Sequence, residues 1–411
     1  MLDPVLKPSS LLLAASFVAV MTALLAACTA TPERASKPMP VAPLPGRVEH
    51  SPRLGPPLAL KNDPAVQIFA TDFNELPGWH QDDHAAAFQS FQRSCTGWRT
   101  QPDERALGGI FELGRVGDWK KLCGIGVANG QEKQFFERWF RPYAVASSGS
   151  FDGLFTGYFV PQLRGSLRPG PRFRVPVYGL PNDLVKRNGQ SGRLVNGQLL
   201  PYYQRADIVA GALAGKGLEL LWVDSDIDAF FMEIQGSGQV LMDDGSIRHL
   251  SFAGKNGHGY YAIGKTLVDR GEITRENLSM QTIRDWIIRH PQEGRDLMLL
   301  NPSYVFFKFG DARTIDGPIG SMNVPLTAGY SLAVDKHYLP LGVPLWLDAE
   351  HPASQRRLQR LVMAQDTGGA IKGVIRGDVF WGTGEQAGDM AGGMKSRGRY
   401  FLLVPRHIVA G

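Results

Sequence analysis

Two aspartates that the chain can bring together are the first candidates for chemistry. Asp366 ends an apolar segment, Asp378 lies within the next one, and the glycine-rich connection 368–373 can fold the chain back between them. Both carboxyl groups would then lie at one end of a sheet, beside Phe380 and Trp381. A carboxyl group that lies among aromatic side chains and near a second carboxylate has a raised pKa and can donate a proton near neutrality. Because an aromatic ring also offers a flat face to a sugar, the pattern indicates acid–base chemistry on a carbohydrate.

Two other interpretations of this segment remain open. In a structural role, Asp366 caps a turn and Asp378 forms a surface ion pair with Lys372 or Arg376. The Asp-Thr-Gly triplet that begins at Asp366 also matches the catalytic triplet of aspartic proteases, which need two such aspartates facing each other. The chain has no second Asp-Thr-Gly or Asp-Ser-Gly, so a protease would have to be a homodimer, which we disfavour.

Three further patterns resemble binding motifs but lack essential residues. His80 and His84 have the spacing of a zinc-binding helix, but position 81 is Gln where the motif requires Glu. Segment 224–235 opens like a calcium loop, yet it lacks the turn glycine and the bidentate glutamate. Segment 236–238 lacks the third glycine of a dinucleotide-binding loop. We therefore predict neither a metal nor a cofactor.

The N-terminal segment predicts an export signal. Residues 11–27 form an apolar run that is short for a membrane-spanning helix and ends at a small-residue site. The Leu-Ala-Ala-Cys sequence that ends at Cys28 is similar to the cleavage site of bacterial lipoproteins, in which this cysteine is lipidated. We expect a signal peptide at 1–27, lipidation of Cys28 and a Pro-rich tether at 28–57. An ordinary exported protein is the alternative.

The composition is that of a folded globular protein, and the length predicts two domains. The chain has 411 residues, of which 43% are hydrophobic and 20% charged, and this length exceeds what one core usually supports. The net charge of +5 is spread without the basic stripe of a nucleic-acid-binding protein, so we predict no nucleic-acid partner. Three cysteines are too few for a disulfide scaffold. Export would place Cys95 and Cys123 in an oxidising compartment, where a disulfide and two free buried thiols are both possible.

Strand patterns dominate the part of the chain that follows the tether. Helices are predicted at 82–93, 132–140 and 281–289. The predicted strands are short segments rich in β-branched and aromatic residues, at 155–160, 174–180, 218–223, 229–235, 304–309, 343–347, 360–365, 374–381 and 399–405. The fold class is therefore mainly β with peripheral helices, and it favours barrels over a doubly wound sheet.

Seven segments together resemble the family of membrane-bound lytic murein transglycosylases A. In family order they are LPGW at 76–79, FTGYFVP at 155–161, PYYQRADI at 201–208, FFMEIQGSG at 230–238, NPSYVFFKF at 301–309, GPIGSMNVPLTAGYSLAVD at 317–335, and DTGGAIKG…GDVFWG at 366–382. The likeness spans nearly all of residues 65–405. One departure is Val160, which stands where many members carry Glu.

The resemblance implies an architecture, a reaction and a catalytic residue. A double-psi β-barrel domain would combine 58–160 with 303–411, and a smaller β domain inserted at 161–302 would form the other wall of a glycan groove. The reaction would cleave the β-1,4 bond between N-acetylmuramic acid and N-acetylglucosamine without water, leaving 1,6-anhydromuramoyl ends. Asp378 would be the catalytic acid and base, and Asp366 its companion.

Substrate contacts are expected from side chains near the strand ends that these segments contain. The candidates are Thr156, Tyr158, Gln235, Gly236, Ser237, Lys372 and Trp381. Gly236 and Gly238 would let the backbone approach the glycan, although both glycines can instead serve strand bends. Trp346 is a second stacking candidate, and Lys372 would contact a muramoyl or peptide carboxylate.

A non-catalytic, peptidoglycan-binding lipoprotein is the alternative function, because barrels of this kind also bind polysaccharides without cutting them. The expected partners are peptidoglycan strands, the membrane through the lipid anchor, and cell-wall synthases or amidases. Thr29, rather than Asp, follows Cys28. This favours the periplasmic face of the outer membrane.

Overall fold

The computed structural model describes residues 52–60, 63–187, 189–310 and 317–408, which belong to one compact unit beginning at His50. The predicted signal peptide, the lipidated Cys28 and residues 28–51 of the tether lie outside these ranges. Within them, no helix has the length and apolar character needed to span a bilayer.

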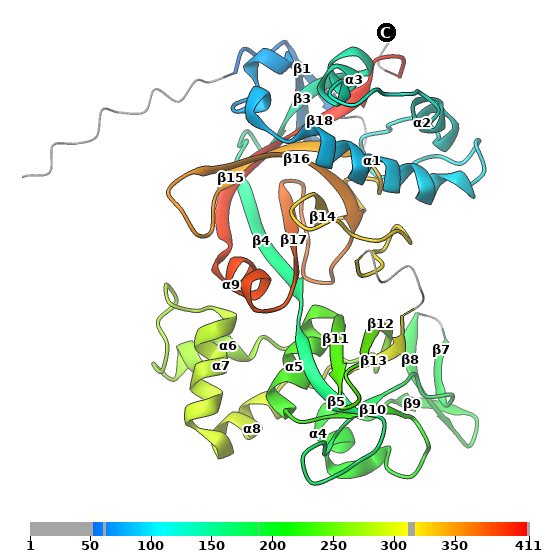
Figure 1. Ribbon diagram of the computed structural model, residues 1–411, viewed down its shortest axis with the longest axis vertical. Helices are drawn as coiled ribbons and strands as arrows, with labels where there is room; N and C mark the ends of the chain where they lie inside the picture. The colour runs from blue at the N-terminus through cyan, green and yellow to red at the C-terminus, as the bar shows by residue number, and fades with distance from the viewer. Residues whose placement is uncertain (1–51, 61–62, 188, 311–316, 409–411) are drawn as a thin grey trace, which may run out of the picture. The chain divides into compact units, whose positions relative to one another are not determined.

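A nine-stranded sheet contains a closed barrel. Its strands are β1 (Pro57–Leu60), β2 (Asp63–Ala70), β3 (Phe140–Ser147), β4 (Gly153–Val160), β14 (Ser331–Val334), β15 (Pro344–Glu350), β16 (Arg357–Asp366), β17 (Arg376–Thr383) and β18 (Lys395–Pro405). They pair in the order β1-β2-β3-β18-β15-β16-β14-β17-β4, and a further pairing of β4 with β18 closes the last six into a barrel. The pairs β14–β16 and β17–β4 are parallel, and the other barrel pairs are antiparallel. This arrangement confirms a mainly β fold built on a barrel (Figure 1).

Helices cover this sheet and bury one of the residues proposed to stack on sugars. They are η1 (Phe73–Glu75), η2 (Trp79–Gln81), α1 (His84–Arg99), α2 (Val116–Cys123), α3 (Glu132–Trp139) and α9 (Glu385–Gly393). Trp346 on β15 is fully buried, and its Nε1 donates to the Pro77 carbonyl at 3.1 Å. The predicted stacking of Trp346 on a sugar is therefore wrong, because its ring lies within the core.

The helical layer settles one question that the sequence left open, the pairing of two cysteines, and shows where the two spaced histidines lie. Cys95 and Cys123 form a disulfide that joins α1 to α2, with their Cα atoms 5.6 Å apart. His80 lies in η2, whereas His84 begins α1. The N-cap Asp83 lies between the two histidines and accepts a hydrogen bond from the backbone N–H of Ala86 at 3.1 Å. The two histidines therefore do not share the helix that zinc-binding spacing presumes.

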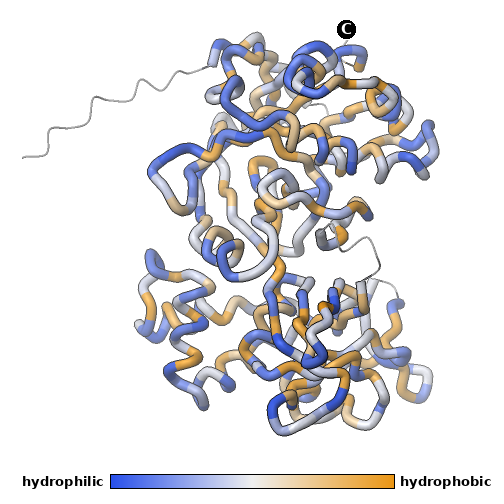
Figure 2. The backbone as a smooth tube through the Cα atoms, viewed as in Figure 1, coloured by the Kyte–Doolittle hydropathy of each residue, from blue (hydrophilic) through white to orange (hydrophobic). Residues whose placement is uncertain are grey.

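The segment between the two halves of the barrel forms a second sheet with its own helices. The six-stranded sheet has the order β13-β12-β11-β5-β10-β6, and β7-β8-β9 form a small separate sheet. The strands are β5 (Gln162–Ser166), β6 (Val175–Tyr178), β7 (Leu184–Arg187), β8 (Gln190–Val195), β9 (Gln198–Pro201), β10 (Glu219–Val223), β11 (Ser237–Met242), β12 (Ile247–Lys255) and β13 (Val305–Phe309). The helices are α4 (Arg205–Asp207), η3 (Ile208–Ala212), α5 (Asp226–Gln235), α6 (Ile263–Asp269), α7 (Met280–Arg289) and α8 (Pro291–Leu299). In Figure 2 hydrophobic segments follow the barrel strands and this second sheet.

The strand predicted at 229–235 is wrong, because these residues belong to helix α5. Ser225 caps the helix by accepting from the backbone N–H of Asp228 at 3.0 Å, and Gly236 ends it with a φ of 77°. Met232 packs against the six-stranded sheet, whereas Phe230 packs against α6 to α8. A helix that is apolar on two sides shows no one-sided period of 3.6, so its sequence resembles that of a buried strand.

The chain crosses between the barrel and the second sheet twice. Pro161 alone separates β4 of the barrel from β5 of the second sheet. The predicted return at 303 is too early, because β13 pairs with β12 of the second sheet. The chain therefore returns to the barrel after Phe309, and the insert contains helices as well as the predicted strands.

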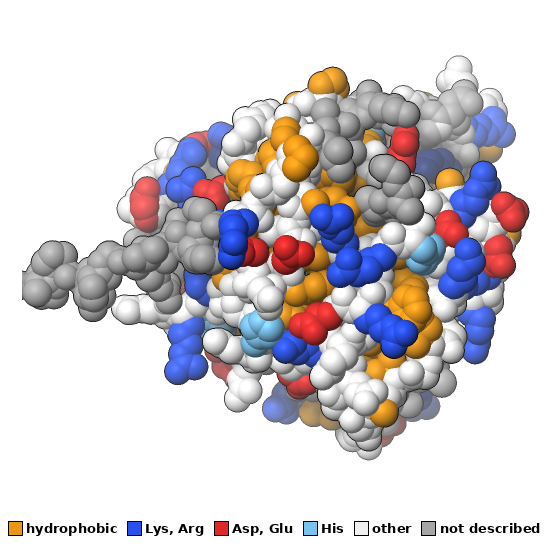
Figure 3. Space-filling model, turned by 90° about the horizontal axis from the view of Figure 1, so that it is seen from above, with side chains coloured by type: hydrophobic (Ala, Val, Ile, Leu, Met, Phe, Trp, Pro, Cys, Tyr) orange, Lys and Arg blue, Asp and Glu red, His pale blue; other side chains and the backbone are white. Residues whose placement is uncertain are grey.

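Basic and acidic side chains alternate on the face of the molecule that Figure 3 shows. Lys and Arg side chains are interspersed there with Asp and Glu, and apolar side chains lie between them.

Candidate active site

The barrel topology brings Asp366 and Asp378 to neighbouring positions. Asp366 ends β16, Asp378 lies within β17, and β14 runs between these two strands. Ala333 of β14 pairs with Asp366 on one side and with Asp378 on the other. Both aspartates are half-buried. The predicted meeting of two carboxylates is thus achieved across one intervening strand.

Asp378 is held by a hydroxyl group rather than by a cation. Thr156, its partner on the parallel strand β4, donates from Oγ1 to Asp378 Oδ1 at 2.5 Å. Arg376 Nη2 donates in turn to Thr156 Oγ1 at 2.8 Å. Among the described residues Asp378 makes no ion pair within 4 Å, so the alternative of a surface ion pair with Lys372 or Arg376 does not hold.

The surroundings of Asp378 raise its pKa from 3.8 to about 6. Burial is the largest cause, because it penalises the charged form. The hydrogen bond from Thr156 and the charge of Arg376 oppose this effect, and the charge of Asp366 adds to it. A carboxyl group with a pKa of about 6 populates both its protonated and its ionised form near neutral pH, as an acid–base catalyst requires.

Asp366 is fixed by three donors. Tyr158 OH donates to its Oδ2 at 2.8 Å, and Ser321 donates to its Oδ1 from the backbone N–H at 2.9 Å and from Oγ at 2.8 Å. Burial, followed by the charge of Asp366, raises the pKa of Tyr158 well above 10, so this hydroxyl stays protonated and donates. The hydroxyl of Tyr158, predicted to contact glycan, is therefore occupied by Asp366. Ser321 was not among the predicted residues, although it lies in the family-like segment 317–335.

The residues predicted to contact glycan near the end of α5 have different surroundings in the structure. Gln235 ends the helix, and its Oε1 accepts from the Phe159 backbone N–H at 3.3 Å. Gly236 caps the helix in a left-handed conformation and has open space where a side chain would start. A Cβ on Gly238 would lie 2.2 Å from Met232 Sδ, so this glycine allows the close packing of α5 on β11, and its approach to glycan stays a prediction.

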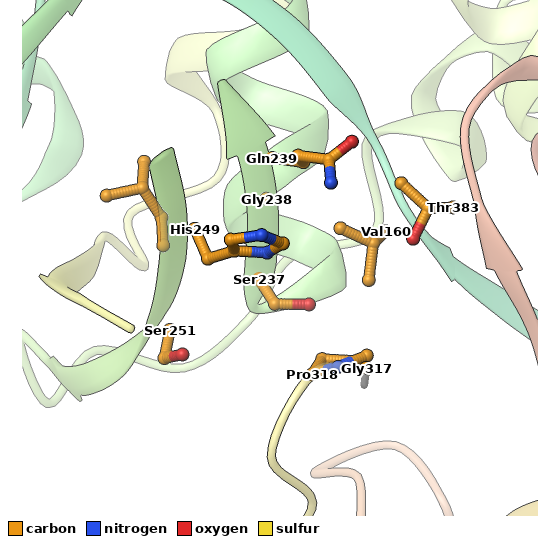
Figure 4. A pocket seen from close by; sticks show the side chains of 10 residues that line it. Val160, Ser237, Gly238, Gln239, His249, Ser251, Gly317, Pro318 and Thr383 are labelled. Carbon is orange, nitrogen blue, oxygen red and sulfur yellow. The ribbon is translucent and has the colours of Figure 1, made fainter. Parts of the chain in front are cut away.

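Ser237 begins β11 and lines a pocket between the second sheet and the barrel strands. Figure 4 shows Ser237, Gln239 and His249 around this pocket, with Val160 and Thr383 on the opposite side. A second hollow is lined by Gly157, Phe159, Gln235, Met280, Ala391 and Gly392. Residues of both sheets therefore line these two hollows, and the barrel strands β4 and β17, which carry Thr156 and Asp378, each contribute to the lining.

Trp381 and Lys372 have contacts other than the predicted ones. A Cβ on Gly157 would lie 2.6 Å from Trp381 Nε1, so the indole packs closely on β4. The Nε1 atom is buried and has no hydrogen-bond partner among the described residues. Lys372 is exposed and lies 3.9 Å from Asp335 Oδ1. Packing accounts for the position of Trp381, and the substrate contacts of both residues stay predictions.

Three of the family-like segments meet in the core of the insert, where sequence reasoning assigned no role. Arg205 donates bidentately to Glu233 at 3.0 and 2.9 Å. The same guanidinium also donates to the carbonyls of Asn301 and Ser303 at 3.1 and 2.6 Å. Both charged side chains are almost fully buried. These segments are thus joined by a structural ion pair that shapes the insert.

Comparisons with known proteins match both parts of the chain. The family model described as the MltA specific insert domain matches residues 154–308, and the 3D domain matches residues 330–404. The chain is 38% identical over 257 residues to the membrane-bound lytic murein transglycosylase A of Vibrio cholerae, which covers 61% of this chain and 65% of that relative. The match thus spans just under two thirds of the length of that curated relative.

Two solved structures extend the likeness over more of the fold. The membrane-bound lytic murein transglycosylase of Agrobacterium tumefaciens is 33% identical with a TM-score of 0.75, and the match covers 83% of this chain and 98% of that one. MltA of Escherichia coli with bound chitohexaose is 30% identical with a TM-score of 0.61, covering 79% of this chain and 90% of that one.

Proposed function

Since the chain belongs to the membrane-bound lytic murein transglycosylase A family, we propose that it cleaves the β-1,4 bond between N-acetylmuramic acid and N-acetylglucosamine in peptidoglycan without water. The products carry 1,6-anhydromuramoyl ends. The observation that carries this proposal is Asp378, a half-buried carboxyl group without an ion pair among the described residues and with a pKa of about 6.

The first step is proton donation by Asp378. Its protonated carboxyl group gives the proton to the glycosidic oxygen, the bond from this oxygen to C1 of the muramoyl residue breaks, and N-acetylglucosamine leaves with a free hydroxyl group. The electron pair of the broken bond stays on that oxygen, so C1 acquires the character of an oxocarbenium ion. A general acid with a pKa close to the working pH is suited to this step.

The second step uses the same carboxylate as a base. The C6 hydroxyl of the muramoyl residue attacks C1 and passes its proton to Asp378, which restores the starting form of the enzyme. The nucleophile and the electrophile belong to one sugar, so effective molarity replaces the second carboxylate that hydrolytic glycosidases need. Water is neither consumed nor released.

Arg376 and Thr156 decide which oxygen of Asp378 carries the proton. The Thr156 hydroxyl has one hydrogen, and because it accepts from Arg376 it points that hydrogen at Asp378 Oδ1. Oδ1 is therefore engaged as an acceptor, and the proton for transfer is carried on Oδ2. Asp366, fixed by Ser321 and Tyr158, raises the pKa of Asp378 by its charge.

In this proposal, the glycan lies along the hollows beside Gln235, Gly236 and Ser237. The relative from Escherichia coli holds chitohexaose, a polymer of N-acetylglucosamine, which supports a glycan as the ligand of this chain. Lys372 and Trp381 remain proposed contacts at the rim.

The location is also a proposal. We propose a lipid anchor on Cys28 that holds the protein at the periplasmic face of the outer membrane, where peptidoglycan, synthases and amidases are the accessible partners. Incorporation of a palmitate analogue that is lost in Cys28→Ala would support the anchor, and unchanged labelling would refute it.

The decisive experiment is mass spectrometry of digested peptidoglycan with the wild type and Asp378→Asn. We expect products lighter by one water than hydrolysed muropeptides, and a loss of about 10³-fold in rate for the variant, within the range for removal of a general acid. Glu350→Gln is a control variant, because Glu350 is an exposed carboxylate at the end of β15. That end pairs with the first residue of β16, whereas Asp366 is the last residue of β16. Reducing-end muropeptides would indicate a muramidase, and binding to sacculi without soluble products would indicate the non-catalytic alternative.

A further inference from the structure

The regular pairing of β14 with β16 is broken next to Asp366. Leu332 of β14 pairs with Ala364 of β16. The next residue of β14, Ala333, pairs with Asp366 and skips Gln365. Gln365 is therefore an extra residue in β16, and it forms a β-bulge. Bulges are rare between parallel strands such as these, and they are common beside active sites, where they change the direction of a side chain.

The bulge decides which side chain of β16 lies level with Asp378. Ala333 also pairs with Asp378 of β17, so the residue of β16 that pairs with Ala333 lies at the level of Asp378. In a regular ladder this residue would be Gln365. Asp366 would then pair with Val334, one position beyond Asp378, and a slip of one residue also turns a side chain to the other side of the sheet. The two carboxylates therefore meet because the bulge is present.

The side-chain amide of Gln365 is fully buried and makes four hydrogen bonds. Its Nε2 donates to the Ser90 carbonyl at 2.8 Å and to Ser94 Oγ at 2.9 Å. Its Oε1 accepts from Ser331 Oγ at 2.6 Å and from Ser90 Oγ at 3.2 Å. A carbonyl oxygen can only accept, so the contact with the Ser90 carbonyl fixes which end of the amide is the nitrogen. The amide thus joins the bulge to helix α1 and to the first residue of β14.

The backbone of Gln365 holds the loop that binds Asp366. The Gln365 carbonyl accepts from the Met322 backbone N–H at 3.1 Å. The residue before Met322 is Ser321, which donates to Asp366 from its N–H and from its hydroxyl. One residue therefore fixes the bulge to the core through its side chain and to this loop through its backbone.

Building on the proposed function, we infer that Gln365 is a positioning residue whose amide holds the β-bulge that places Asp366 level with Asp378. Gln365 has no exposed surface, so it acts through Asp366 rather than on the substrate. The charge of Asp366 contributes to the raised pKa of Asp378. An apolar side chain at 365 removes the four hydrogen bonds and leaves buried serine groups without this partner, so the bulge relaxes and the charge moves away from Asp378.

The test measures the pKa of Asp378 in Gln365→Met, in Asp366→Asn and in the double variant. Methionine is as long and as flexible as glutamine but has no amide. The pKa is read from the basic limb of the kcat/KM profile. It is read independently of turnover from the NMR titration of isotope-labelled aspartate carboxyl groups, in which the Asp378 signal is the one that Asp378→Asn removes. Ser331→Ala, which removes one of the four hydrogen bonds, is a milder variant should Gln365→Met not fold.

Asn256→Leu is the matched control. Asn256 is 1% exposed, and its amide also makes four hydrogen bonds, two to backbone carbonyls and two from backbone N–H groups. It directly follows β12 in the insert. Both variants should lower the midpoint of denaturant unfolding, so a loss of stability does not separate them. The pKa of Asp378 does, because Asn256→Leu should leave it unmoved.

We expect Gln365→Met to lower the pKa of Asp378 by no more than Asp366→Asn does, and to add no further shift in the double variant, because both substitutions act through one charge. Ser331→Ala should shift it in the same direction and less. An unchanged pKa in Gln365→Met, or in Ser331→Ala where the first variant does not fold, would overturn the inference, and so would a shift that adds in full to that of Asp366→Asn. A wild type that releases no anhydro product, while Gln365→Met still shifts the NMR titration of Asp378, would refute the proposed function and leave the positioning role supported.

Discussion

A buried carboxylate in the insert and a half-buried one in the barrel have opposite surroundings. Glu233 in the insert is 7% exposed. It accepts hydrogen bonds from both Nη atoms of Arg205 and from the backbone N–H of Val305. Asp378 in the barrel receives one threonine hydroxyl, and the nearby guanidinium of Arg376 is bonded to that threonine rather than to the carboxylate. Burial raises the pKa of both groups, but the clasp around Glu233 opposes it with a full countercharge.

The difference shows how one fold assigns structure and chemistry to the same type of group. A carboxylate held by a bidentate guanidinium is fixed in one geometry, and Glu233 accepts three hydrogen bonds in this way. A carboxyl group that is desolvated without a countercharge can hold a proton near neutral pH and still exchange it. The insert is therefore built around its carboxylate, whereas the barrel keeps its carboxylate available.

Breaking the insert pair should have the largest effect on stability. Arg205→Met leaves Glu233 buried without its countercharge, and we expect unfolding free energy to fall by about 3–5 kcal/mol in denaturant titration. Arg284→Met is the matched control, since its ion pair with Asp228 joins α7 to α5 with both side chains about one third exposed. That variant should lose no more than about 1 kcal/mol. Similar losses in the two variants would contradict the structural role given to the buried pair.

Removing the charge of Asp378 should stabilise the fold, whereas breaking the Arg205–Glu233 pair destabilises it. The pKa of this group is 3.8 in the unfolded chain and about 6 in the folded one, so its ionised form destabilises the fold above pH 6 and costs nothing below pH 4. Asp378→Asn should therefore raise the unfolding free energy at pH 7.5 by about 1–3 kcal/mol, and the gain should vanish as the pH falls through 6 towards 4. A gain that does not depend on pH would show that packing, rather than ionisation, is responsible.

The sequence predicted the approach of Asp366 to Asp378 better than the pairing of Arg205 with Glu233. Asp366 and Asp378 are 12 positions apart, and the glycine-rich link between them made their approach a local inference. Arg205 and Glu233 belong to separate family-like segments, and no pattern of spacing indicates that α4 and α5 place them face to face. Ser321 was missed for the same reason, because it reaches Asp366 from 45 residues away through a loop.

The errors about elements have a related physical origin. Helix α5 packs Met232 against the sheet and Phe230 against other helices, so its apolar residues form no single stripe. Trp346 was considered for sugar stacking, yet β15 is buried on both sides and its indole lies in the core. In both cases tertiary packing decides the role of an apolar residue, and a pattern along the chain does not reveal how many sides are covered.

The chain of hydrogen bonds from Arg376 through Thr156 to Asp378 provides a finer test of how the pKa of Asp378 is set. The Thr156 hydrogen bond and the Arg376 charge both lower the pKa of Asp378, the former more than the latter. Arg376→Gln should therefore raise this pKa and move the basic limb of the kcat/KM profile to higher pH, and Thr156→Val should move it further. Arg397→Gln removes an exposed charge from β18, which also pairs with β4, and should leave the limb in place. A fall in rate with an unmoved limb would assign Arg376 a purely structural role.

Asp366→Asn should shift the pKa of Asp378 least among these variants, and should lower it rather than raise it. Its charge is the weakest of the four influences on Asp378 and acts to raise the pKa. The neutral amide keeps an acceptor oxygen for Ser321 but removes that charge, so the pKa of Asp378 falls and the basic limb moves to lower pH. Ser321→Ala, which removes one of the three donors to Asp366 and leaves its charge, serves as the control and should leave the limb unmoved. A limb that moves to higher pH in Asp366→Asn would mean that this aspartate acts on Asp378 through position rather than through charge, and the contrast between a clasped and an available carboxylate would then rest on Thr156 and burial.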